Sequence, residues 1–66
     1  MAKTVYEHLM SEKDSCERIA KRYREELMAN GPSAFIAMEA EHFEIRARAI
    51  ELAAQNLPVE VAEKEI

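Results

Sequence analysis

Glu39 and His42 form an E-x-x-H pair, the one combination of side chains here whose spacing suits a metal ion. Residues three apart lie on adjacent turns of one helix face, and carboxylate-bridged di-iron bundles use this spacing. Such a site needs more carboxylates, which a second copy of the chain could supply. The first half of the sequence places no glutamate on its apolar seam. We therefore expect no metal and no other cofactor, and keep Glu39 with His42 as the alternative metal site.

Cys16 is the only cysteine, so no disulfide can stabilise the chain, and an unpaired thiol fits a reducing, cytoplasmic compartment. It is a weak candidate for a nucleophile, because its spacing places it on an apolar seam. His8 lies two turns away, with no carboxylate evident to orient it. We interpret Cys16 as a small buried apolar side chain. Because no pair of groups suits acid–base chemistry, we predict that the protein is not an enzyme.

A short basic stretch could contact phosphates or a partner protein; it comprises Arg18, Lys21, Arg22 and Arg24. In a dimer, two copies would lengthen this basic patch. Acidic residues at helical spacing are expected to neutralise it, in the pairs Asp14 with Arg18, Glu17 with Lys21, and Lys21 with Glu25. The formal net charge of −4 also gives no general reason to expect a nucleic-acid partner. RNA binding through the basic patch is therefore an alternative hypothesis.

Helices must position these residues, because the composition has few breakers and the breakers are clearly placed. Thr4 and Glu7 predict a capping box that starts a helix near residue 5. Gly31 can close that helix, Pro32 fits the first turn of a second, and Pro58 follows its end. No apolar run approaches the roughly 20 residues of a membrane span, so we expect no membrane partner. The predicted single domain, residues 1–66, has helices at about 5–30 and 33–57, a turn at 31–32 and a frayed tail at 58–66.

Each predicted helix carries an apolar seam with heptad spacing. The first seam runs through Tyr6, Leu9, Lys13, Cys16, Ala20, Tyr23 and Leu27, and the second through Ile36, Ala40, Phe43, Ala47, Ile50, Ala54 and Leu57. Folding the chain at the turn often opposes a bulky side chain to alanine or cysteine, as close packing requires. Lys13 is the polar exception, and its stem can lie along Ile50 while its ammonium reaches water. The pattern predicts an all-α, antiparallel two-helix hairpin.

The second predicted helix has a further apolar strip, displaced by two residues and hence by about 200° from its seam. The strip consists of Phe35, Met38, His42, Ile45, Ala49 and Leu52. A lone hairpin would expose it, and exposed strips of this kind mark interaction surfaces. A chain of 66 residues also buries little surface by itself. We predict a homodimer with coiled-coil packing, in which two hairpins form a four-helix bundle; a different protein covering the strip is the alternative.

The alternation of alanine and bulky residues in a hairpin of this length resembles Rop, a plasmid copy-number regulator whose dimer binds paired RNA loops. The order and composition of the whole chain, from KTVYEHLMSEKDSCERIAKRYREELMANGPS onward, are similar to short accessory proteins of lambda-like phage early regions. The first resemblance implies an RNA-binding regulator. The second implies a non-enzymatic accessory or host-takeover protein that binds an unidentified host or phage protein. A di-metal ferroxidase-like assembly through the E-x-x-H pair is the third hypothesis.

Overall fold

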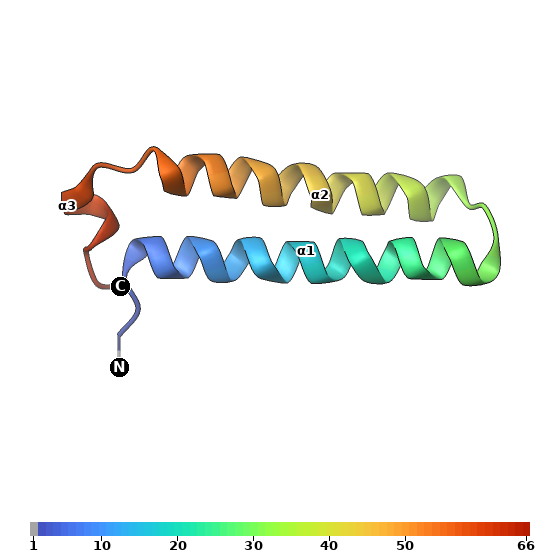
Figure 1. Cartoon of the computed structure of the whole chain (residues 1–66), viewed down its shortest axis with the longest axis horizontal. Helices are drawn as coiled ribbons and strands as arrows, with labels where there is room; N and C mark the ends of the chain where they lie inside the picture. The colour runs from blue at the N-terminus through green and yellow to red at the C-terminus, as the bar shows by residue number, and fades with distance from the viewer. Residues whose placement is uncertain (1) are drawn as a thin grey trace.

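Two long antiparallel helices make up most of the computed structural model, which describes residues 2–66. Helix α1 spans Val5–Asn30, α2 spans Ala34–Gln55, and a short α3 spans Val59–Ala62. Figure 1 shows α1 and α2 side by side along their lengths, with α3 at the end opposite the turn. The predicted all-α hairpin is confirmed, and residues 2–66 contain no β-strand. Within this part of the chain, no helix is both long and apolar enough to cross a membrane.

The ends of α1 form as the sequence predicts. The backbone N–H of Glu7 donates to Thr4 Oγ1 at 3.1 Å, and the N–H of Thr4 donates to Glu7 Oε1 at 3.0 Å. This capping box satisfies donors that the first turn of a helix leaves free. At the other end, Gly31 adopts a φ of 86°, and its N–H donates to the carbonyl of Leu27. A glycine suits this position because a side chain would be strained at that φ.

Helix α2 is slightly shorter than the predicted residues 33–57. Ser33 precedes it as the N-cap, where its hydroxyl oxygen accepts a hydrogen bond from the N–H of Ile36 at 3.3 Å. The helix ends at Gln55, and the side-chain amide of Asn56 donates to the carbonyl of Leu52 at 2.8 Å. Pro58 follows closely and disfavours a helical conformation for the residue before it.

The C-terminal segment differs from the frayed tail expected for residues 58–66. After α3, the backbone runs beside the start of α1, where Thr4 and Glu65 form an isolated antiparallel bridge. The N–H of Val5 donates to the carbonyl of Lys64 at 2.8 Å, and the N–H of Ile66 donates to the carbonyl of Lys3 at 2.9 Å. The tail thus gives the first turn of α1 an acceptor that the helix itself lacks.

The hairpin is a single layer of helices with extents of 46 × 23 × 12 Å, so its thickness is that of one helix. Small side chains alone are buried between α1 and α2, namely Cys16, Ala20, Ala40, Ala47 and Ala54. Larger ones pack at the edges of this contact: the rings of Tyr23 and Phe43 stack with centroids 6.1 Å apart. A layer this thin leaves its other apolar side chains in contact with water.

Candidate functional site

The six strip residues predicted as an oligomer interface lie on the side of α2 that faces away from α1. Phe35 and Met38 are each 68% exposed, Ile45 is 61% exposed and Leu52 is 46% exposed. His42 and Ala49 are also exposed. By contrast, three alanines at heptad spacing on the opposite side of α2 are buried, Ala40, Ala47 and Ala54. The two-sided helix expected from the sequence is therefore present, and we call the exposed side the outer strip.

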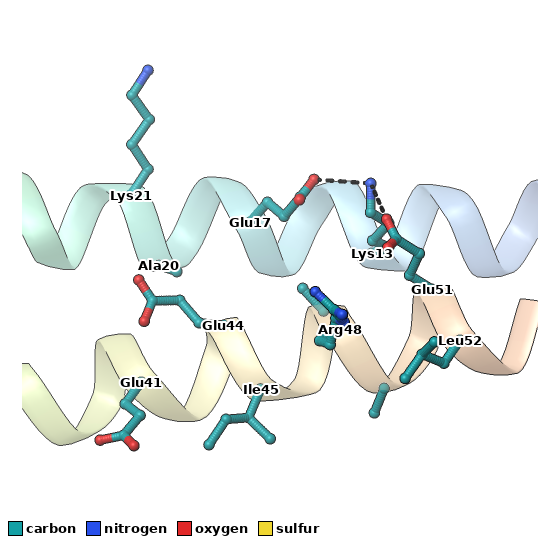
Figure 2. Close-up of a pocket in the computed structure, with 12 residues that line it drawn as sticks. Lys13, Glu17, Ala20, Lys21, Glu41, Glu44, Ile45, Arg48, Glu51 and Leu52 are labelled. Atoms are coloured by element: carbon teal, nitrogen blue, oxygen red, sulfur yellow. Dashed lines mark ion pairs between the residues drawn. The ribbon is translucent and has the colours of Figure 1, made fainter.

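Acidic residues on the inner flank of α2 bind basic residues of α1. Arg24 donates to both carboxylate oxygens of Glu44, at 2.7 and 3.0 Å. This hydrogen bonding lowers the pKa of Glu44 and raises the pKa of Arg24. Glu51 lies 3.3 Å from the ammonium of Lys13, which also lies 3.3 Å from Glu17 (Figure 2). These contacts join the two helices along one edge of the hairpin.

Lys13 does not reach into open water as expected. Its side chain is only 16% exposed, and its ammonium is held between the carboxylates of Glu17 and Glu51. Hydrogen bonding to Glu51 and then to Glu17 raises the pKa of Lys13. The low exposure of Lys13 agrees with its position on the apolar seam. Glu51, the residue after Ile50, and Glu17 determine where the charge lies. The i, i+4 spacing of Lys13 and Glu17 is a detectable signal for one of these contacts.

A second group of α2 charges has no ion-pair partner within residues 2–66. It comprises Glu39, Glu41, Arg46 and Arg48, none of which lies within 4.0 Å of an opposite charge. Glu39 and Arg46 follow strip residues directly and lie on one flank, seven residues apart. Glu41 and Arg48 precede strip residues and lie on the other flank, also seven apart. The outer strip is thus bordered on each side by one acidic and one basic residue.

An open groove of about 700 Å³ lies between α1 and α2 on one face of the hairpin. Its lining residues are Lys13, Glu17, Ala20, Lys21, Glu41, Glu44, Ile45, Ala47, Arg48, Ala49, Glu51 and Leu52. In Figure 2, Glu44 is directed toward α1, whereas Ile45 and Glu41 are directed away from it. The groove therefore continues into the outer strip. This combined surface is apolar and has a charged border.

The basic patch is arranged differently from the prediction. Arg24 is occupied by Glu44, and Arg18 donates to the hydroxyl of Ser15 at 3.3 Å. None of the three expected intrahelical ion pairs is formed within residues 2–66, and Glu17 contacts Lys13 instead of Lys21. Lys21 is exposed and points away from α2 in Figure 2. The structure therefore separates Arg24 from Arg18, Lys21 and Arg22, which are exposed on the outer surface of α1.

The residues considered for metal or thiol chemistry are not assembled into a site within one chain. The ring of His42 packs edge-on against that of Phe43, with centroids 5.2 Å apart. In the part of the chain that the structure describes, no three His, Cys, Asp or Glu side chains are grouped as a metal ion would require. Cys16 is buried between the helices, as its place on the seam predicts. Its environment is that of a packing residue.

Comparison of this chain with protein-family models, with curated proteins and with solved structures finds no match.

Proposed function

We propose that this protein is a non-enzymatic interaction module that forms a homodimer through the outer strip. One observation carries the proposal: four large apolar side chains, Phe35, Met38, Ile45 and Leu52, are 46–68% exposed along the same side of α2. Burial of each such side chain stabilises a complex by up to about 1.5–3 kcal/mol. Self-association is the simplest way to cover them, because a closed dimer needs only one kind of surface.

The exposed area of the hairpin supports this proposal. Its accessible surface is 5128 Å², whereas a compact monomer of 7.6 kDa is expected to expose about 4,300 Å². The excess of about 800 Å² matches the area that each partner buries in an interface of standard size. A dimer through the outer strip would bring the hairpin back to the exposure of an ordinary small protein.

In such a dimer, the two α2 helices lie inside a four-helix assembly and the two α1 helices lie outside. The outer surface of α1 is charged and includes Arg18, Lys21 and Arg22, all of which are exposed. We propose that this surface binds a second protein, in keeping with the accessory role implied by the resemblance to phage early-region proteins. Paired helices present it already ordered, which lowers the entropic cost of binding.

Sedimentation of the wild-type chain and of Ile45→Asp tests self-association. Ile45 is 61% exposed in the hairpin, so its burial should stabilise the dimer by roughly 1–2 kcal/mol per copy. The aspartate loses this gain and adds an unpaired carboxylate to the interface. We expect a wild-type dimer and a monomeric variant.

Met28→Asp is the matched control, because Met28 is an apolar residue of α1 that is 88% exposed and lies outside the outer strip. This control should remain dimeric. A well-folded wild-type monomer at the highest concentrations tested would overturn the proposed function.

A further inference from the structure

The proposed dimer has a preferred direction. On the basis of the proposed function, we propose that the second copy docks with its α2 antiparallel to the first. We further propose that Glu39, Glu41, Arg46 and Arg48 specify this orientation. These four residues are the charges that border the outer strip and form no ion pair within the described chain. Their arrangement along α2 is the basis of the inference.

The outer strip has the same spacing in both directions. Its six positions are separated by 3, 4, 3, 4 and 3 residues, so reversing the helix superimposes the strip on itself. A two-fold axis near residues 43–44 therefore brings every strip residue opposite another strip residue. The layers formed are Phe35 with the partner's Leu52, Met38 with the partner's Ala49, and His42 with the partner's Ile45. A large side chain meets a smaller one in the Met38 layer, as efficient packing favours.

The same axis brings opposite charges together on both flanks. Glu39 comes beside the partner's Arg46, and Glu41 comes beside the partner's Arg48. Because the axis repeats each contact, four intermolecular ion pairs form. The acidic residues occupy the first half of the strip and the basic residues the second half, which is the distribution that an antiparallel pair requires. Figure 2 shows Glu41 directed away from α1, and Glu41 forms no ion pair within the described chain.

A parallel dimer fits the same residues less well. It would oppose each strip residue to its own copy, so Phe35, His42 and Ala49 would face identical side chains and sizes would not alternate. Flanking residues in parallel helices interact with a partner residue five positions along. Glu41 would then meet the partner's Arg46, but Arg48 would meet the partner's Ala53. The parallel arrangement therefore gives half as many ion pairs as the antiparallel one.

Charge reversal at one position distinguishes the two orientations. Arg48→Glu replaces two attractive contacts with two repulsive ones in the antiparallel dimer, but removes no contact from the parallel dimer. We expect its dimer dissociation constant, from sedimentation at several concentrations, to rise about 10- to 30-fold. Arg22→Glu is the matched control, since it makes the same change of charge on α1, at an exposed residue outside the strip. The control should stay within about twofold of the wild type.

Exchange of the two charges provides the decisive variant. Glu41→Arg combined with Arg48→Glu restores opposite charges in the antiparallel dimer, so its dissociation constant should return close to that of the wild type. In a parallel dimer, the arginine introduced in place of Glu41 would instead face the partner's Arg46 and weaken association. Circular dichroism of each variant verifies that the helices are retained.

The outcomes separate this inference from the proposed function. A wild-type dimer that Arg48→Glu leaves unchanged, or that the double variant fails to restore, would overturn the antiparallel arrangement while self-association stands. A folded wild-type monomer would overturn both.

Discussion

Ala40 fixes how closely α1 and α2 approach, and substitution with leucine tests this packing. The residue is 0% exposed, and it does not line the groove beside Ala47. The added atoms of Ala40→Leu therefore have no space to enter unless the helices move apart. Overpacking of this kind costs about 1–3 kcal/mol of unfolding free energy. In a domain of this size, each kcal/mol lowers the melting temperature by about 4–8 °C, so we expect a decrease of roughly 4–24 °C.

Thermal melting followed by circular dichroism measures this effect. All variants must be compared at one protein concentration, because self-association raises the apparent stability. Ala53→Leu is the matched control, since it makes the same change on an exposed position of α2 and should alter the melting temperature little. Ala47→Leu should be tolerated better than Ala40→Leu, because Ala47 lines the open groove. An Ala40→Leu variant as stable as the control would refute the close helix contact at this position.

Two further predictions concern the ends and the edge of the hairpin. Thr4→Ala removes the hydroxyl acceptor of the capping box and should lower the unfolding free energy by about 1 kcal/mol, as measured by thermal or urea unfolding. Thr4→Ser keeps a hydroxyl at this position and should retain most of the wild-type stability. Hydrogen bonding to Arg24 lowers the pKa of Glu44 in the folded protein. The stability that this carboxylate adds to the fold is therefore complete above its unfolded pKa near 4.5, and it is lost as the pH falls through its folded pKa. The melting temperature should therefore decrease below about pH 4.5, and Glu44→Gln should make this decrease shallower; identical pH profiles would contradict the assignment.

Local signals in the sequence were enough to predict the hairpin. Thr4 and Glu7 mark the start of α1, and Gly31 marks its end, because capping and turn formation depend on neighbouring residues. Periodicity also placed Cys16 in the helix contact and the strip residues outside it, since both follow from the geometry of one helix. Such features need no knowledge of how distant segments meet.

Contacts between distant segments could not be predicted in the same way. The pairing of Arg24 with Glu44 depends on the register and separation of the two helices, and many other charged pairs were compatible with the sequence. The pairing of Val5 with Lys64 uses backbone atoms, which leave no pattern in the side chains. Glu17 shows why even a local ion pair could not be predicted. Lys13 and Lys21 both lie four residues from it, and Glu51 of α2 helps to hold Lys13 in place.

The backbone contact between Lys3 and Ile66 brings the two extremities of the described chain to one point beside α1. A short glycine linker between these residues would convert the hairpin into a closed ring without displacing either helix. Cutting that ring at Gly31 would yield a circular permutant in which α2 precedes α1. Ring closure reduces the conformational entropy of the unfolded polypeptide, so the cyclic form should unfold at a higher temperature than the linear one.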